Sequence, residues 1–491
     1  MKLHLINHKY KYAVEQIMLM MFPDERPEYG EPDSGISAVV KLSLGEKYAT
    51  ASTRLFYHGG EFDGYSRVSR EKLYDKLSTD RLLQKIIKLS FYKAASSATG
   101  YRPVWGALTG IRPGKIITQL LEQGISENQA EHIMIKEYHV SPDRAALCLD
   151  TARAALSAKN SLSTRDVALY IGIPFCPTRC AYCSFVSHSV EKSIKLIDPF
   201  LTALFSEIDG LSSIARDTGL TITSVYIGGG TPTTLSEMQL SALMEKLSAS
   251  FDFSQVREYT VEAGRPDTIT PEKLTALKIG GATRVSINPQ SMSDSVLSAI
   301  GRRHTAEEVY TAVAAAQQTG FECINMDVIA GLPADSVSGF KDTLDKVISL
   351  SPGNITVHTL SLKKGSRIRL EKTTIPDANE VSAMLDYAAQ ALLREGYAPY
   401  YLYRQKFISG GFENIGWSRP GLKSLYNICM MEELCTTLAL GGGGVTKLVA
   451  AGSGRIERIF NPKYPYEYNN NIDKTIENKS NIKAFYEQNI F

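Results

Sequence analysis

The sequence has little cysteine, little tryptophan and no long apolar run. Its 491 residues include seven cysteines and two tryptophans. So low and odd a cysteine count argues against a disulfide framework and favours a reducing compartment, so we expect a cytoplasmic protein. The apolar run Ile17-Met18-Leu19-Met20-Met21 is too short to cross a membrane, and no small-residue cleavage site lies near it. We therefore expect neither a membrane span nor a secretory leader.

An excess of charge of one sign is also missing. The formal net charge is +2, which gives no support for a nucleic acid or a membrane surface as partner. A composition that is 43% hydrophobic and 22% charged is that of an ordinary globular protein. The chain is too long for one small core, and its length favours two or three domains.

From residue 166 onward, short β-branched runs alternate with stretches of helical spacing. The predicted strands are 167–173, 222–227, 259–261, 284–287, 324–329 and 355–360. Such alternation predicts parallel strands joined by right-handed helical crossovers. Six units suit an incomplete (β/α)6 barrel better than an eight-stranded one, and a doubly wound sheet is the alternative. The predicted fold class is α/β.

Polar residues and glycines follow these strands. A cysteine loop follows the first strand, Gly228-Gly229-Gly230-Thr231-Pro232 the second, and Glu262 ends the third. Asn288 and Gln290 follow the fourth, Asp327 lies in the fifth, and His358 lies in the sixth. Because active sites of α/β sheets and barrels form at the carboxyl ends of strands, we expect these residues around one mouth.

The flanking parts differ from this pattern. We expect an α+β domain of unknown role over 1–165, the barrel over 166–375, and a small C-terminal domain with a polar tail over 376–491. A hairpin is predicted from 36–42 and 48–56, and helices over 81–92, 115–121 and 379–394. The tail after Pro462 is rich in Asn, Lys and Glu, which predicts a polar surface helix.

The segment "YIGIPFCPTRCAYCSF", residues 170–185, places Cys176, Cys180 and Cys183 at C-x3-C-x2-C spacing. Three thiolates can bind three irons of a [4Fe–4S] cube and leave the fourth iron open to a substrate or cofactor. A zinc site that uses the nearby His188 is the main alternative, and three unpaired buried thiols are a further one. The other four cysteines, Cys148, Cys323, Cys429 and Cys435, are expected to pack in the core.

The loop resembles the motif of radical S-adenosylmethionine enzymes, and "GGGTP" resembles their glycine motif. This resemblance implies a [4Fe–4S] cluster on Cys176, Cys180 and Cys183, and reductive cleavage of S-adenosylmethionine to a 5′-deoxyadenosyl radical. It also implies that Tyr182 lies beside the adenine. Glycine suits the second motif because a missing side chain lets the backbone approach a ligand.

Further stretches narrow the resemblance. "YIGGGTPT", "TVEAGRPD", "RVSINPQSM", "GRRHT" and "INMDVIAGLP" are similar to the oxygen-independent coproporphyrinogen III dehydrogenases, and "LTGIRPGK" with the long N-terminal extension to their firmicute branch. The resemblance implies that Tyr170, Gly229 and Glu262 contact the cluster-bound S-adenosylmethionine. It implies a second S-adenosylmethionine whose site is lined by Gly230, Thr231, Gln290, Arg302 and Asp327. It assigns no catalytic side chain.

The resemblance implies a tetrapyrrole substrate, coproporphyrinogen III, and reduced flavodoxin or ferredoxin as electron donor. Two positions depart from related patterns. Phe185 stands where the best-characterised branch has a fourth cysteine, and Glu413 stands where haem chaperones have histidine. Another radical reaction on a tetrapyrrole and haem binding by a chaperone are therefore the alternatives. Lys363, Lys364, Arg367 and Arg369 form either a solvated face or a site for propionates.

Overall fold

The structure is a computed structural model that describes residues 1–33, 35–183, 188–189, 193–361, 366–371, 373–405, 411–450, 452 and 454–489. The chain forms two compact units, Met1–Leu149 and Asp150–Phe491, and helix α5 (Pro142–Asn160) carries the chain from one to the other. The three-domain division expected from the sequence is finer than this and stays a prediction. No helix of the described residues is long and apolar enough to cross a membrane.

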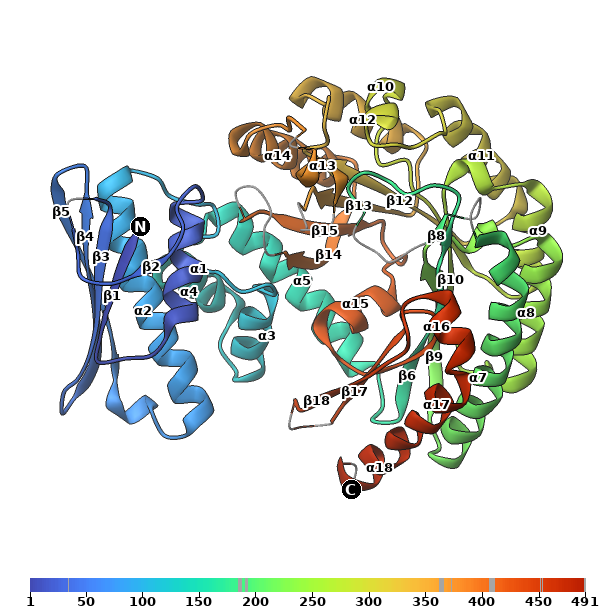
Figure 1. The fold of residues 1–491 in the computed structure, drawn as a ribbon, viewed down its shortest axis with the longest axis horizontal. Coiled ribbons are helices and arrows are strands. Elements are labelled where there is room, and N and C mark those ends of the chain that lie inside the picture. The colour runs from blue at the N-terminus through green and yellow to red at the C-terminus, as the bar shows by residue number, and fades with distance from the viewer. Residues whose placement is uncertain are drawn as a thin grey trace. The chain divides into compact units, whose positions relative to one another are not determined.

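The N-terminal unit is a five-stranded sheet with helices on it (Figure 1). Its strands are β1 (Lys2–Ile6), β2 (Glu28–Tyr29), β3 (Ser37–Leu44), β4 (Tyr48–Tyr57) and β5 (Gly60–Ser69), in the order β2-β1-β3-β4-β5. Its helices are α1 (Lys11–Met21), α2 (Lys76–Thr99), α3 (Gly114–Glu122) and α4 (Glu127–Glu137). The predicted hairpin is confirmed by β3 and β4, which pair antiparallel with Ala38 opposite Leu55. The predicted helices over 81–92 and 115–121 are α2 and α3.

Six parallel strands form the centre of the second unit. They are β6 (Asp166–Ile173), β9 (Thr221–Gly229), β10 (Glu258–Gly264), β11 (Arg284–Ile287), β12 (Cys323–Ala330) and β13 (Asn354–Thr359). They lie side by side in chain order, each paired parallel with the next. The order confirms the predicted partial barrel and excludes a doubly wound sheet, in which the strand order reverses at a switch point.

The C-terminal segments extend this sheet at both edges. On one side β16 (Thr436–Gly441) pairs parallel with β6, followed by β17 (Val445–Val449) and β18 (Ile456–Phe460). On the other side β15 (Glu413–Ser418) and β14 (Ala398–Arg404) add antiparallel pairs beyond β13. The sequence analysis predicted none of these five strands, which together with the six parallel strands make a sheet of eleven strands among the described residues.

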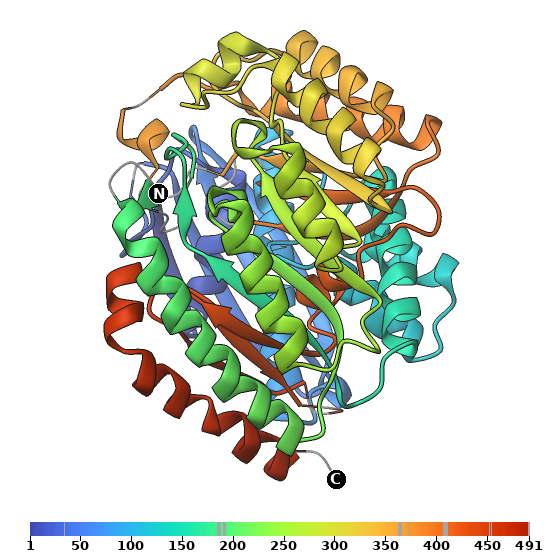
Figure 2. The same ribbon diagram turned by 90° about the vertical axis from the view of Figure 1, so that its right-hand side faces the viewer.

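Helices cover the outer face of the parallel strands. They are α7 (Ile197–Asp217), α8 (Glu237–Ser250), α9 (Pro271–Ile279), α10 (Asp294–Ala299), α11 (Ala306–Thr319), α12 (Val337–Ser349) and α14 (Ala378–Arg394), with α15 (Leu425–Glu432) on the other side. The short helix α13 (Arg367–Leu370) lies against the cysteine loop, where the Ile368 N–H donates to Ala181 O at 3.4 Å. Figure 2 shows α7, α8, α9 and α11, green to yellow, lying side by side over the strands. Helix α14 is the helix predicted over 379–394.

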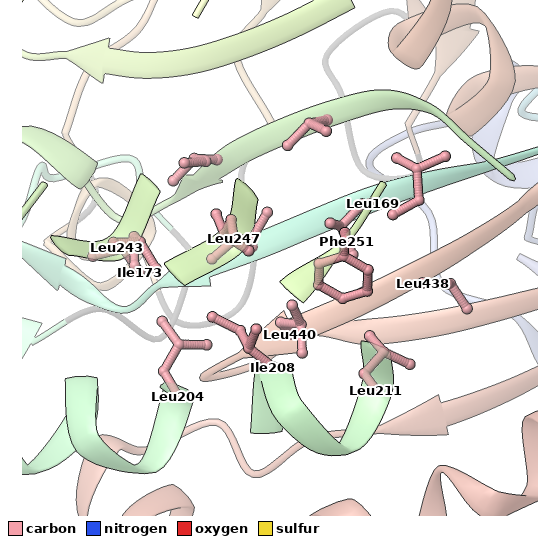
Figure 3. Packing of buried hydrophobic residues seen from close by; sticks show 14 of the residues in the cluster. Leu169, Ile173, Leu204, Ile208, Leu211, Leu243, Leu247, Phe251, Leu438 and Leu440 are labelled. Atoms are coloured by element: carbon pink, nitrogen blue, oxygen red, sulfur yellow. The ribbon is translucent and has the colours of Figure 1, made fainter. Parts of the chain in front are cut away.

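The main core lies between the strands and these helices. Leu204, Ile208 and Leu211 of α7 meet Leu169 of β6 and Leu440 of β16 (Figure 3). All five side chains are fully buried. Each such side chain contributes about 1.5–3 kcal/mol relative to an exposed one, so this layer fixes β6 and the loop that follows it.

The tail differs from the predicted single polar helix. It forms α16 (Pro465–Asn470), α17 (Ile472–Asn478) and α18 (Ser480–Asn489), which run along α7 (Figure 2). Tyr468 and Lys479 are buried and bind the buried carboxylate of Glu207 on α7, with Lys479 Nζ 3.0 Å from Glu207 Oε1. Glu207 Oε2 also accepts the Gly441 N–H at 2.7 Å. The tail is thus part of the fold, and its polar composition concealed these buried contacts.

Candidate active site

Tyr170 and several of the residues expected at one mouth lie in the carboxyl-terminal halves of neighbouring strands. Tyr170 is in β6, Gly229 ends β9, Glu262 is in β10, Asp327 is in β12 and His358 is in β13. Because these strands are parallel and adjacent, their ends form one rim of the sheet. The parallel sheet thereby brings together residues that are up to 188 positions apart, from Tyr170 to His358.

The cysteine loop leaves this rim after β6. Cys176 ends the short strand β7 (Phe175–Cys176), and the Cys183 N–H donates to the Cys180 carbonyl at 3.1 Å in a tight turn. The Ala181 N–H donates to the carbonyl of Ile300 at 2.9 Å, which ties the loop to the segment after α10. None of the three cysteines forms a disulfide within the described residues, and all three are partly exposed. Phe185 lies outside the described residues, as does the side chain of His188.

Backbone hydrogen bonds join the glycine motif to the cysteine loop. The Gly230 N–H donates to Ile173 O and the Thr231 N–H to Phe175 O, both at 2.7 Å. A Cβ on Gly230 would lie 2.4 Å from the carbonyl oxygen of Phe175 and 3.0 Å from Cys176 Sγ. Only glycine allows so close an approach. Thr231 Oγ1 lies 3.6 Å from Cys176 Sγ, so the two motifs form one structural piece.

Glu262 is held by two donors at the rim. The Tyr226 hydroxyl donates to Oε1 at 2.7 Å, and the Gly229 N–H donates to Oε2 at 3.2 Å. Burial raises the pKa of Glu262 to about 7, and the negative charge of Asp327 adds to the rise, although Tyr226, Gly229 and His358 oppose it. The carboxyl group is therefore fixed in orientation and titrates near neutral pH.

The pKa of Asp327 is shifted in the opposite direction from that of Glu262. Burial by itself raises the pKa of this carboxyl, but His358 outweighs it together with Asn325 and Thr356, and the pKa is lowered. His358 Nε2 lies 3.6 Å from Asp327 Oδ2, and Asn325 Nδ2 donates to Oδ1 at 2.9 Å. Asp327 is thus an ionised carboxylate, and His358 is a rim residue.

Arg302 and Tyr182 meet beneath the cysteine loop. Arg302 Nη2 donates to the Tyr182 hydroxyl at 3.0 Å and Nη1 to the Asn288 carbonyl at 2.9 Å. Burial lowers the pKa of the guanidinium, but Tyr182 and Cys180 outweigh it and raise the pKa, so Arg302 stays charged. Its Nε is buried and makes no hydrogen bond to any described residue. A buried donor in this state is suited to an acceptor on a ligand.

Gln290 has an unusual backbone. Its φ is +67°, in the left-handed region that residues other than glycine rarely adopt. The conformation is held by the Gln290 N–H, which donates to Asp327 O at 2.9 Å, and by the Gln290 carbonyl, which accepts from Ile329 N at 3.0 Å. Such residues are concentrated at functional sites, and here the strain sets Gln290 against the strand that carries Asp327.

Sequence reasoning did not single out two side chains of this region. Tyr226 binds Glu262, and its ring forms a cluster with the rings of Tyr426 (centroids 4.4 Å apart) and Tyr170 (6.3 Å). Arg265 pairs with Asp267 at 2.8 Å, donates to Thr178 Oγ1 at 2.7 Å, and lies 4.0 Å from Cys180 Sγ. Arg265 lies three residues after Glu262 in the stretch "TVEAGRPD", and this nearness to Glu262 is the sequence signal that could have identified it.

Other candidate residues have structural roles. The four remaining cysteines are buried, as predicted: Cys148, Cys323, Cys429 and Cys435. Asn414 is buried in β15, where its Oδ1 accepts the Thr359 N–H at 2.9 Å, and Glu413 is buried beside it. Arg367 is exposed and pairs with Glu371 at 3.0 Å, so it belongs to a solvated face. Lys363 and Lys364, and the side chain of Arg369, lie outside the described residues.

Across the described ranges, no three His, Cys, Asp or Glu side chains converge on the position of one metal ion. A cubane cluster does not require such convergence, because each cysteine ligates a different iron.

Comparison with known proteins agrees with this geometry. The family model of the radical SAM superfamily matches residues 170–347. The oxygen-independent coproporphyrinogen-III oxidase-like protein HemZ of Bacillus subtilis is 39% identical over 92% of this chain and 90% of its own length. Heme chaperone HemW of Haemophilus influenzae is 28% identical over 62% of this chain and 75% of its own.

Among solved structures, coproporphyrinogen III oxidase (HemN) from Escherichia coli matches with a TM-score of 0.52 and 23% identity, over 66% of this chain and 73% of that chain. This likeness supports the partial-barrel fold. The site and the family match define the chain as a radical S-adenosylmethionine protein, a class that implies a [4Fe–4S] cluster and S-adenosylmethionine. Within that superfamily, it belongs to the family of the oxygen-independent coproporphyrinogen-III oxidase-like proteins.

Proposed function

We propose that this protein oxidatively decarboxylates coproporphyrinogen III to protoporphyrinogen IX. Two of the four propionates each lose a β-hydrogen atom to a 5′-deoxyadenosyl radical, one electron to an external electron acceptor, and carbon dioxide, and each becomes a vinyl group. The observation that carries the proposal is the 39% identity, over nearly the whole chain, to a protein named for its likeness to oxygen-independent coproporphyrinogen-III oxidase. Reduced flavodoxin or ferredoxin is proposed as the electron donor.

In this proposal Cys176, Cys180 and Cys183 hold the [4Fe–4S] cluster. The donor set fits, since three thiols lie on one short loop and are partly exposed. When bound, the reduced cluster and S-adenosylmethionine supply the radical chemistry that removes a hydrogen atom from the substrate. The side chain of Arg265, 4.0 Å from Cys180 Sγ, places positive charge beside the thiolates.

The first S-adenosylmethionine is proposed to contact Tyr170, Tyr182, Gly229 and Glu262. Support comes from Glu262, whose two oxygens are oriented by Tyr226 and Gly229. A carboxylate in a fixed orientation can accept a charge-assisted hydrogen bond from the ammonium group of the methionine moiety. The close approach of Gly230 to Phe175 keeps this part of the backbone against the cysteine loop.

A second S-adenosylmethionine is proposed at Gly230, Thr231, Gln290, Arg302 and Asp327. The buried Nε of Arg302 suits a ligand carboxylate, and the ionised Asp327 suits an ammonium group or ribose hydroxyls. The N–H groups of Gly230 and Thr231 are already bonded within the loop, so these two residues would contribute shape or side chain instead. Equilibrium dialysis should give two bound molecules per chain and one for Asp327→Ala. One bound molecule in both proteins would refute the second site.

One anaerobic assay separates the proposed function from its alternatives. The reconstituted protein is supplied with S-adenosylmethionine, a reductant, and either coproporphyrinogen III or haem, and the products are identified by mass spectrometry. Vinyl products with 5′-deoxyadenosine support the proposal, whereas an altered haem would indicate another radical reaction. Tight haem binding without turnover would indicate a chaperone, a function that the buried Glu413 and Asn414, both paired with β14, do not favour.

A further inference from the structure

The N-terminal unit contains a pocket that the proposed chemistry does not use. Its volume is about 240 Å³, and it lies between helix α2, residues 107–110 and Tyr138. One of its walls is the start of "LTGIRPGK", the stretch at residues 108–115 that has no role in the site on the sheet rim. Leu89, Ala107 and Leu108 give the pocket an apolar part.

The polar part of the pocket is cationic. Arg81, Lys85 and Lys88 line it, and none of its described lining residues is acidic. Positions i, i+4 and i+7 share one face of a helix, so the three side chains extend over about 10 Å along α2. They belong to a segment between Asp80 and Glu122 that contains seven Lys and Arg residues and neither Asp nor Glu.

Two of these cations, Lys85 and Lys88, are held in place by contacts within the N-terminal unit. Lys85 Nζ pairs with Glu137 at 2.8 Å and lies 4.1 Å from the centroid of the Tyr138 ring. Lys88 Nζ donates to Gln16 Oε1 at 3.2 Å, an oxygen that the Thr109 hydroxyl also approaches at 3.3 Å. Gln16 of α1 thus links Thr109 of the loop wall to Lys88 of the helix wall.

We propose that this pocket binds a small organic polyanion, a molecule with two or more phosphate or carboxylate groups. Charges spread over about 10 Å match several anionic groups better than one. The volume, at about 30 Å³ per water-sized group, holds on the order of ten non-hydrogen atoms. The apolar wall and the Tyr138 ring accommodate a carbon skeleton. Bound anions also relieve the repulsion among like charges on successive turns of α2.

The test is calorimetric titration of the reconstituted full chain with inorganic diphosphate and, separately, with citrate. A double variant, Arg81→Gln with Lys88→Gln, removes two pocket charges. Lys93→Gln is the matched control, because Lys93 is on the same helix but its Nζ contacts Tyr65 O at 3.1 Å, away from the pocket lining. Release of 5′-deoxyadenosine by each variant checks that the rest of the chain is intact.

We expect saturable binding of at least one probe, weakened about tenfold or more in the double variant and about twofold or less in Lys93→Gln. Binding of diphosphate alone would identify a phosphate ligand, and binding of citrate alone a polycarboxylate. Failure of both probes to saturate would overturn the proposal. So would equal binding by the parent and the double variant, or an equal loss in Lys93→Gln, which would indicate general charge attraction.

Discussion

The hydroxyl of Tyr226 on β9 donates a hydrogen bond to Glu262 Oε1 on β10 over 2.7 Å. The bond links the strand that carries the glycine motif to the strand that carries the acid. It opposes the effect of burial, which raises the pKa of Glu262 to about 7. Tyr226 is therefore a positioning residue whose removal should change the charge of Glu262 as well as its orientation.

Tyr226→Phe should weaken S-adenosylmethionine binding at neutral pH. In the proposed site Glu262 would bind an ammonium group as a carboxylate, so in the parent the affinity should rise as the pH increases through about 7. Loss of the hydroxyl raises the pKa further, so the curve of dissociation constant against pH should shift to higher pH. One unit of pKa shift would weaken binding up to about tenfold below the pKa, and high pH should restore it.

Tyr426→Phe is the control, because the Tyr426 ring stacks on Tyr226 at 4.4 Å while the Tyr226 hydroxyl keeps its bond to Glu262. The dissociation constants are measured anaerobically by calorimetry between about pH 6 and about pH 9. Superimposable curves for the parent and Tyr226→Phe would show that this hydrogen bond does not tune the acid.

Much of the fold was predictable because its signals are local. The six predicted strands are short β-branched runs, and their alternation with helices defines the parallel sheet. Strand β16 has an equally apolar sequence, but it pairs with β6 across more than 260 residues, and no local pattern encodes that pairing. The tail was misjudged for a related reason: its few buried groups, such as Tyr468 and Lys479, are scattered among polar residues.

For the site, the sequence predicted the positions of individual residues but not the contacts between them. Most of the positions that the family resemblance supplied lie in the carboxyl-terminal half of a strand of the same parallel sheet or in the segment that follows it. Tyr226 was missed because an aromatic residue within a strand looks like core, and its partner lies 36 positions away on the neighbouring strand. The electrostatic contrast between Glu262 and Asp327 depends on the neighbours that face each carboxyl, which the sequence does not reveal.

Gly230→Ala should impair cluster assembly. The new Cβ would lie 2.4 Å from Phe175 O, so the glycine motif and the cysteine loop must separate. Reconstituted Gly230→Ala should retain less than about half of the four irons that the parent holds. Gly30→Ala is the control, since no atom lies within 4 Å of its Cβ position. Full iron content together with normal S-adenosylmethionine cleavage in Gly230→Ala would contradict the importance of this contact.

Glu207→Gln should destabilise the second unit strongly. Glu207 and Lys479 are fully buried and 3.0 Å apart, so the substitution leaves a buried ammonium group without its counter-charge. The expected loss of unfolding free energy is about 3–5 kcal/mol, measured by urea denaturation. The control is Asp209→Asn, two residues after Glu207 on α7. It breaks an exposed ion pair between Asp209 and Lys246 of α8, and should cost about 1 kcal/mol or less. Equal losses would mean that the buried network does not anchor the tail.

The central claim is that a propionate β-carbon gives up a hydrogen atom to the adenosyl group. The most direct test uses coproporphyrinogen III deuterated at the β-carbons of its propionates, incubated anaerobically with the reconstituted protein, S-adenosylmethionine and a reductant. We predict that mass spectrometry will find one deuterium in the 5′-deoxyadenosine formed, together with vinyl products. Unlabelled 5′-deoxyadenosine accumulating beside unchanged coproporphyrinogen would contradict the assigned substrate, while leaving the radical chemistry of the cysteine loop in place.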